Sequence, residues 1–161
     1  MDKEGFKRFF ETWFDPIRNY LYYNCGDRDL STDIAQEVFL KVWEKKFNIS
    51  DDRIKGLLYK MAKEMFISQY RKSMVEKKYL ESLKFNYEEY ATDSSLEHKE
   101  LGERYEAALA RLPSTQREVF LMSRNEEMKY SEIAERLRIS VKAVEKRMTL
   151  ALSGLRQSLK L

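Results

Sequence analysis

The C-terminal third of the chain carries an apolar pattern that restricts the fold more than any other feature of the sequence. Ile133, Ala134 and Leu137 recur at the spacing of one short helix face. A second apolar face follows at the same period, at Val141, Val144, Met148, Leu152 and Leu155. Ala134 is small enough to let two helices cross closely. The pattern predicts helices at about 131–137 and 141–158, joined by a tight turn.

Such a pair has the design of a helix-turn-helix, in which the second helix lies in the major groove of DNA. Ser140 stands where it can cap the second helix, and Arg138 occupies a turn position that is often glycine because its φ is positive. The residues that we expect to meet base edges and phosphates are Arg138, Ser140, Val141, Lys142, Glu145, Lys146 and Arg147. A helical packing unit that does not bind DNA is the alternative for this segment taken alone.

The composition favours an all-α fold. Only 5 Gly and 2 Pro occur among 161 residues, which argues for helices with few turns. No apolar run is long enough to span a membrane, and the N-terminus has no apolar core of a signal peptide, so we expect a cytoplasmic protein without membrane insertion. Cys25 is the single cysteine, which excludes a disulfide framework.

Charge is distributed in three blocks. Residues 1–75 hold 14 basic and 12 acidic residues, and residues 104–161 hold 12 basic and 7 acidic ones. The segment between them, 76–103, holds 4 basic and 8 acidic residues. Two basic blocks around an acidic one suggest two domains that face nucleic acid and a connector at 76–103.

The N-terminal block reads as three helices, at residues 4–23, 30–46 and 54–72. We expect Pro16 to kink or divide the first, and Ser31 or Thr32 to cap the second. Further along, we expect a connector from Met74 to Thr92 with some helix, a helix that starts at Asp93-Ser94-Ser95 and runs to Leu112, and another at about 114–124. We expect no strand.

The helix predicted at 30–46 has two contrasting faces. Its core stripe is Ile34, Ala35, Val38, Phe39, Val42 and Trp43. Opposite this stripe lie polar and acidic residues around one apolar side chain, namely Asp33, Gln36, Glu37, Leu40 and Glu44. An acidic face with a central apolar residue suits a basic protein partner. An ordinary solvated face with one exposed Leu is the alternative.

The helix predicted at 54–72 interleaves basic and aromatic residues. Lysines and arginines can neutralise phosphates, and Tyr59, Phe66 and Tyr70 can stack on unpaired bases. A core helix with a basic outer face is the alternative. His98 and Cys25 have no partner at ligand spacing, and no phosphate-binding Gly loop or nucleophile–base set is present, so we expect no enzyme, no metal site and no cofactor.

Three motifs in order resemble the extracytoplasmic-function (ECF) class of bacterial sigma factors. They are Asp33-Ile34-Ala35-Gln36-Glu37-Val38-Phe39-Leu40-Lys41-Val42-Trp43, then Leu57-Leu58-Tyr59-Lys60-Met61-Ala62, then Leu112-Pro113 with Arg117-Glu118-Val119-Phe120 and the helix-turn-helix. The resemblance implies two helical domains, sigma region 2 at 1–75 and sigma region 4 at 104–161, joined by the acidic linker at 76–103.

The resemblance also implies partners. The Asp33–Trp43 helix would bind the clamp of the largest subunit of RNA polymerase core, through Asp33, Gln36, Glu37, Leu40 and Glu44. The next helix and its preceding loop would bind the melted minus-ten element, through Lys55, Tyr59, Lys60, Lys63, Glu64, Arg71 and Lys72. The helix-turn-helix would bind the minus-thirty-five element of promoter DNA. An anti-sigma factor is a further expected partner, and no small-molecule substrate is expected.

The chain departs from the family pattern at four positions. Where the family often has Trp, Asn and Asp along the third helix, this chain has Leu57, Glu64 and Ser68, and Ala143 stands where Thr is common. The base preference at the minus-ten element is therefore not carried over. A polymerase-independent helix-turn-helix regulator and a helical adaptor that binds no DNA are the other functions that the sequence allows.

Overall fold

The computed structural model describes residues 2–73 and 96–160, and regular structure within these ranges is entirely helical. The helices are α1 (Lys3–Cys25), α2 (Arg28–Glu44), α3 (Ile54–Ser73), α4 (Leu96–Arg111), α5 (Ser114–Asn125), α6 (Tyr130–Leu137) and α7 (Val141–Leu159). The all-α prediction is confirmed. The connector expected at 74–92 and the helix start expected at 93–95 lie outside the described residues. No described helix has the length and apolar character needed to cross a membrane.

Helix α1 begins and ends with well-defined caps. The Asp2 Oδ1 atom accepts a hydrogen bond from the Gly5 backbone N–H at 2.7 Å, and Gly26 closes the helix in the left-handed conformation with φ 68°. The helix is continuous through Pro16, so the expected division does not occur. One long helix therefore supplies aromatic residues to the core along its whole length.

Helix α2 begins two residues earlier than predicted, at Arg28, because its cap is Asp27. The Asp27 Oδ1 atom accepts from the Leu30 N–H at 3.0 Å. Ser31, one of the two predicted caps, is instead buried inside the first turn, where its hydroxyl donates to the Asp27 carbonyl at 2.6 Å. The prediction of Ser31 or Thr32 as the cap was therefore wrong.

The C-terminal helices form a second bundle in which α7 packs against α4, α5 and α6. Val144, Met148 and Leu155 of α7 are buried as predicted, but Leu152 is 39% exposed. Ala151 is fully buried in its place, because the sequence steps of four, three and four residues from Val144 keep one face of the helix toward the core. Val141, also expected on this face, is 42% exposed at the start of the helix.

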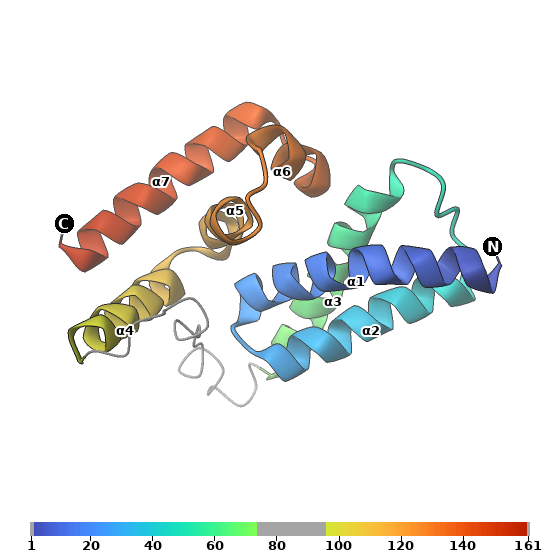
Figure 1. The fold of residues 1–161 in the computed structure, drawn as a ribbon, viewed down its shortest axis with the longest axis horizontal. Coiled ribbons are helices and arrows are strands. Elements are labelled where there is room, and N and C mark those ends of the chain that lie inside the picture. Colours follow the sequence, from blue (N-terminus) through green and yellow to red (C-terminus); the bar gives the residue numbers. More distant parts are fainter. Residues whose placement is uncertain (1, 74–95, 161) are drawn as a thin grey trace.

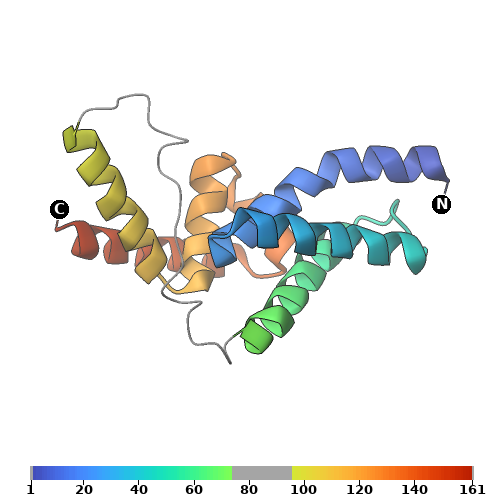
Figure 2. The ribbon, with the colours of Figure 1, turned by 90° about the horizontal axis from the view of Figure 1, so that it is seen from below.

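The two bundles are docked on each other. Helix α5 packs against α1, and α6 packs against α3, so that α5 and α6 lie between α7 and the N-terminal helices (Figure 1). In the perpendicular view, α4 and α7 lie toward the end of the molecule opposite the N-terminus (Figure 2). The buried apolar residues of both bundles belong to one contiguous cluster. The surfaces predicted to bind DNA are therefore positioned by a shared core.

Candidate nucleic-acid interface

The helix-turn-helix has the local geometry that its sequence predicts. Arg138 ends α6 in the left-handed conformation with φ 56°, a backbone conformation that residues other than Gly rarely adopt. Ser140 caps α7, since its Oγ atom accepts from the Ala143 N–H at 3.0 Å. Both predictions are confirmed. The turn therefore fixes the direction in which the first residues of α7 project.

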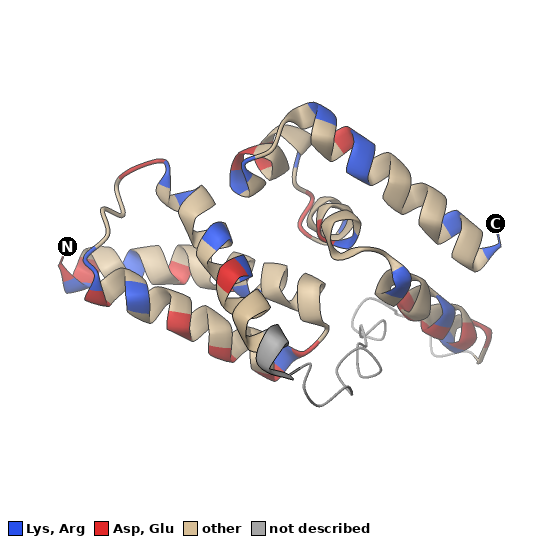
Figure 3. Cartoon of the chain, turned by 180° about the vertical axis from the view of Figure 1, so that it is seen from behind, with Lys and Arg blue, Asp and Glu red and all other residues tan. Residues whose placement is uncertain are grey.

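The N-terminal half of α7 presents a basic outer surface. Lys142, Glu145 and Lys146 are exposed, and Arg147 is half-buried beside them. Lys and Arg residues gather on this half of the helix while its middle is uncharged (Figure 3). Exposed cations next to a helix N-terminus can bind phosphates. The side chains beside them are long enough to reach base edges.

The outer face of α2 is open along its length. Asp33, Gln36, Glu37 and Glu44 are exposed, and Leu40 among them is 54% exposed. The predicted core stripe is buried except at Trp43, which is 38% exposed. Trp43 instead packs its ring at 5.0 Å from that of Phe6 on α1, at the edge of the core. An acidic surface with an apolar centre therefore exists as the sequence indicates.

A groove of about 420 Å³ separates the outer faces of α2 and α3. Its lining includes apolar residues, namely Phe47, Leu57, Met61 and Met65, and charged residues of both signs, namely Glu37, Lys41, Lys45 and Glu64. The predicted polymerase face and the predicted minus-ten face are thus adjacent across this groove. Leu57, one of the departures from the family pattern, lines it.

The aromatic residues of α3 are part of the core in this structure. Tyr59 is 2% exposed, its ring meets that of Tyr20 edge-on at 5.0 Å, and burial raises its pKa to about 12. Phe66 is also buried. Neither ring is open to stack on a base in this structure, in contrast to the expectation, because both are buried in the core. The side chains of Tyr70, Arg71 and Lys72 lie outside the described part of the chain.

The lysines of α3 differ in their surroundings. Lys60 is exposed and lies 3.9 Å from Glu64 on the next turn. Lys63 is mostly covered, and its Nζ atom donates to Asn24 Oδ1 at 2.7 Å and to Glu118 Oε2 at 3.4 Å. Of these two lysines, Lys60 is the one exposed to an approaching phosphate.

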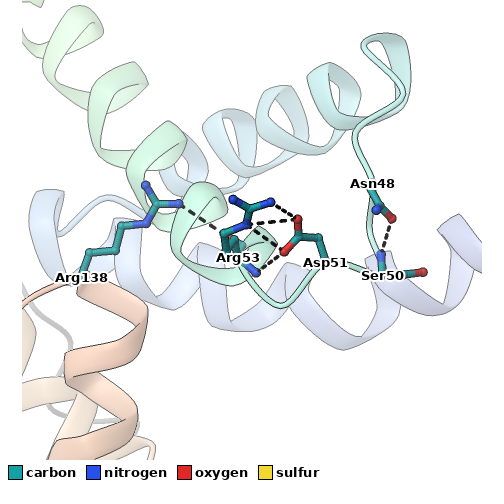
Figure 4. Close-up of polar contacts among 5 residues, drawn as sticks. All are labelled: Asn48, Ser50, Asp51, Arg53 and Arg138. Atoms are coloured by element: carbon teal, nitrogen blue, oxygen red, sulfur yellow. Dashed lines mark hydrogen bonds and ion pairs between the residues drawn. The ribbon is translucent and has the colours of Figure 1, made fainter.

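The loop before α3 is held in one shape by its own polar side chains (Figure 4). The Arg53 guanidinium donates to both carboxylate oxygens of Asp51, at 2.8 and 3.2 Å, and these bonds hold the pKa of Asp51 below its usual value. The Asn48 side chain accepts from the Ser50 N–H at 3.1 Å. Arg138 of the helix-turn-helix reaches this loop, donating to the Arg53 carbonyl at 3.4 Å.

A buried arginine that sequence reasoning did not single out as a site joins the two bundles. Arg117 is 3% exposed and donates to the Tyr23 and Asn24 carbonyls at the end of α1, at 2.6 and 3.0 Å. It also donates to the Leu112 carbonyl at 2.8 Å, just after α4. Burial lowers its pKa to about 10, so it stays protonated at neutral pH. The charged pair Arg117-Glu118, which directly precedes the apolar run 119–122, was the available signal.

The other reactive side chains show no site chemistry. Cys25 is buried, with its sulfur 3.2 Å from the Ser31 hydroxyl. Within residues 2–73 and 96–160, no cluster of three or more potential ligand side chains could hold a metal ion. The features that remain are a basic helix-turn-helix, a basic helix with an ordered loop, and an acidic face. Together they fit a helical DNA-binding protein that carries a separate acidic surface.

Comparison with known proteins identifies the family. Residues 9–74 match the model of sigma-70 region 2, and residues 102–155 match that of sigma-70 region 4. The ferric citrate uptake sigma factor FecI of Escherichia coli (strain K12) is 35% identical over 148 residues, covering 88% of this chain and 83% of that protein. The RNA polymerase sigma factor SigZ of Bacillus subtilis (strain 168) is 24% identical, covering 92% of this chain and 84% of that protein.

The fold has a solved counterpart. The sigma factor RpoE from Bartonella quintana, in a co-crystal structure with the anti-sigma factor NepR, superposes with a TM-score of 0.67 and 20% identity over 98% of both chains. The chain belongs to the sigma-70 family, in its ECF group, and its function is that of a promoter-specific RNA polymerase sigma factor. The proteins of this family are in general not enzymes.

Proposed function

We propose that three described surfaces divide the work of this sigma factor. The outer face of α2 binds the clamp of the largest subunit of RNA polymerase core. Helix α3 and the loop before it bind the melted minus-ten element, and the start of α7 binds the minus-thirty-five element as duplex. The domain limits that go with this division are 1–75 and 104–161, with 76–103 between them.

The observation that carries the proposal is the outer face of α2. A Leu that is 54% exposed lies among four exposed polar and acidic residues, on a helix whose opposite side is buried except at Trp43. Hot spots of protein interfaces combine a central apolar anchor with polar neighbours that exclude water. Leu40 is the anchor, and Asp33, Gln36, Glu37 and Glu44 supply the polar rim.

The two DNA-binding surfaces suit different forms of DNA. A helix N-terminus with Lys142, Glu145 and Lys146 exposed is the right shape for the major groove of a duplex. The α3 surface has exposed Lys60 and the loop that carries Arg53, whose side chain is 87% exposed, and these can follow the backbone of a single strand. The factor hydrolyses no nucleotide in this scheme, so binding energy for the separated strand drives melting.

Two further assignments follow from the family. The similar solved structure is that of a sigma factor bound to an anti-sigma factor, and we propose that this chain also has such a partner. Because core polymerase and promoter DNA are its proposed partners, we propose that the protein works in the cytoplasm.

The experiment that tests this division uses purified protein with core polymerase and promoters selected from a genomic library. Run-off transcription and core binding are measured for an Asp33→Lys/Glu37→Lys double variant and for a Lys142→Ala/Lys146→Ala/Arg147→Ala triple variant. We expect the first to lose core binding and the second to keep core binding while losing promoter-specific transcription.

The matched control is Glu11→Lys, which reverses an exposed acidic residue on α1 outside the proposed surface. It should retain core binding and transcription. Core binding by the α2 double variant at the wild-type level would remove α2 from the polymerase contact. Promoter-specific transcription by the α7 triple variant would remove α7 from the duplex contact.

A further inference from the structure

The surface of α7 that faces duplex DNA in the proposed function carries one charge of the opposite sign. Glu145 is exposed there, with exposed Lys142 and Lys146 beside it, and an acidic segment lies among the basic ones on this part of the helix (Figure 3). Residues four positions apart share a helix face, so Glu145 follows Val141, the first residue of α7, on one stripe. The first turns of the second helix are the part of a helix-turn-helix that meets base edges.

The fold gives the side chain of Glu145 no structural task. The cap of α7 is Ser140, and a capping box would place its glutamate at the third helical residue, which is Ala143. Among residues 2–73 and 96–160, the Glu145 carboxylate forms no ion pair and no hydrogen bond, although lysines lie near it on the helix. Stability therefore does not explain a carboxylate at this position.

A carboxylate on this surface opposes the general attraction between the protein and DNA. Each phosphate that a lysine or arginine neutralises adds to affinity through the release of counterions, whereas an anion close to the backbone is repelled. Lys142, Lys146 and Arg147 favour a duplex of any sequence, and Glu145 weakens that binding. Such a residue raises specificity when one base supplies a contact that compensates for the charge and the other bases do not.

The chemistry of the major groove limits which base can do this. Guanine presents the acceptors N7 and O6, and thymine presents the acceptor O4 and a methyl group, so neither offers a donor to a carboxylate. Adenine has an amino donor at N6 but also the acceptor N7 beside it. Cytosine presents its N4 amino donor and no acceptor of its own. An ionised carboxylate only accepts hydrogen bonds, so cytosine is the base that matches it.

We propose that Glu145 determines specificity at one position of the minus-thirty-five element, where it accepts a hydrogen bond from the N4 amino group of cytosine and its charge rejects the other three bases. This inference rests on the proposed function for the assignment of α7 to duplex DNA. Lys142, Lys146 and Arg147 supply affinity that does not depend on sequence, and Glu145 makes binding depend on the base pair.

The test uses the full chain bound to core polymerase and a duplex library. The library has a randomised minus-thirty-five region and the minus-ten element of a promoter selected from genomic DNA. Bound DNA is sequenced for wild type, Glu145→Gln, Glu145→Ala and Glu103→Gln. Glu103 is the matched control, because it is an exposed glutamate on α4 and its variant loses the same charge outside the proposed DNA surface. Circular dichroism establishes that each variant is folded, and the exposed positions chosen favour this.

We expect wild type to select cytosine at one position of the library, and Glu145→Ala to lose that preference while the other positions keep theirs. Glu145→Gln should shift the same position toward adenine, because a glutamine amide accepts from N6 and donates to N7. Glu103→Gln should select the wild-type sequence. In direct binding to the four promoters that differ at this position, wild type should prefer cytosine at least about fivefold, and Glu145→Ala should bind all four within about twofold.

A modified base tests the hydrogen bond itself. N4-methylcytosine still pairs with guanine, but a methyl group replaces the amino hydrogen that faces the major groove. It should weaken binding of wild type about as much as Glu145→Ala does at cytosine. It should not weaken binding of Glu145→Ala further, because two changes that remove the same interaction are not additive.

Selected sequences that neither Glu145 variant changes would overturn the proposal, as would a responsive position at which wild type prefers a base other than cytosine. The Lys142→Ala/Lys146→Ala/Arg147→Ala triple variant separates this failure from that of the proposed function. If the triple variant loses the preferences in the randomised region and the Glu145 variants keep them, α7 binds the element and Glu145 does not select the base. If the triple variant also keeps them, the assignment of α7 to this element is wrong.

Discussion

Helices α2 and α3 belong to one bundle and both carry charged outer faces, yet the face of α2 is open along its length while that of α3 is partly covered. The α2 face keeps Leu40 and its acidic neighbours exposed, while Lys55, Tyr59 and Lys63 of α3 are in contact with the C-terminal bundle. A partner of α2 would meet an exposed face, whereas the part of α3 that holds Lys55, Tyr59 and Lys63 lies against α5 and α6.

The largest effect should come from Arg117, which joins the C-terminal bundle to the end of α1. Arg117→Met leaves the carbonyls of Tyr23, Asn24 and Leu112 without their donor inside the protein. We expect a loss of about 3 kcal/mol in the free energy of unfolding, measured by urea denaturation. Arg117→Lys should recover only part of it, because one ammonium cannot serve carbonyls at the ends of two helices. If Arg117→Met had the same unfolding midpoint as wild type, the hydrogen bonds of Arg117 to these carbonyls would not contribute to stability.

The second prediction tests the outer face of α2 at Leu40, the apolar residue at its centre. Leu40→Arg should weaken core polymerase binding about 30- to 100-fold, the effect of losing an interface hot spot, measured by competition with labelled wild-type protein. Its melting temperature should match wild type, because Leu40 is already exposed. Binding within about twofold of wild type would show that the exposed Leu is incidental.

A smaller effect is expected at the start of α7, a helix that packs against α4, α5 and α6. Ser140→Ala removes the cap that the Ala143 N–H uses and should cost about 1 kcal/mol of stability. Ser140→Thr retains a cap oxygen and is the matched control. Equal stability of the two variants would indicate that the cap contributes little. A duplex-binding defect in both would point to a direct contact by the serine hydroxyl.

The smallest effect concerns Glu126, where burial raises the pKa of the carboxyl and leaves Oε2 without a hydrogen-bond partner. A raised pKa in the folded state gives stability that is complete below the ordinary value of 4.5 and is lost as pH rises through the raised value. The melting temperature of wild type relative to Glu126→Gln should therefore be higher near pH 5 than near pH 7.5. A difference that does not change with pH would place this carboxyl in water.

Local structure was largely predictable from the sequence. The spacing of Val144, Met148 and Leu155, the Ser140 cap and the left-handed Arg138 all depend on residues within about three helical turns, and each is confirmed. The error at the start of α2 also arose locally, because two neighbouring residues could cap the helix. Asp27 displaced Ser31 as the cap because its carboxylate reaches the free N–H groups of the first turn while the Ser hydroxyl bonds back to a carbonyl.

The docking of the two bundles could not be read from the sequence. The residues that make it, such as Lys63 with Glu118 and Arg136 with Trp13, are separated by tens of positions and follow no periodic pattern. For the same reason Tyr59 looked like a base-stacking residue, since its spacing fits either a core or a binding face. Only the packing of α3 against α1 and α6 buries it.

The sequence by itself determined the helices, the turn of the helix-turn-helix, the acidic face around Leu40 and the family to which these motifs belong. Helical period, caps and charge order act over a few residues, so one chain is enough to specify them. The tertiary structure alone decided which charged face stays open and which is covered. That outcome depends on contacts between distant residues, whose free energies are small and are decided by how two bundles fit.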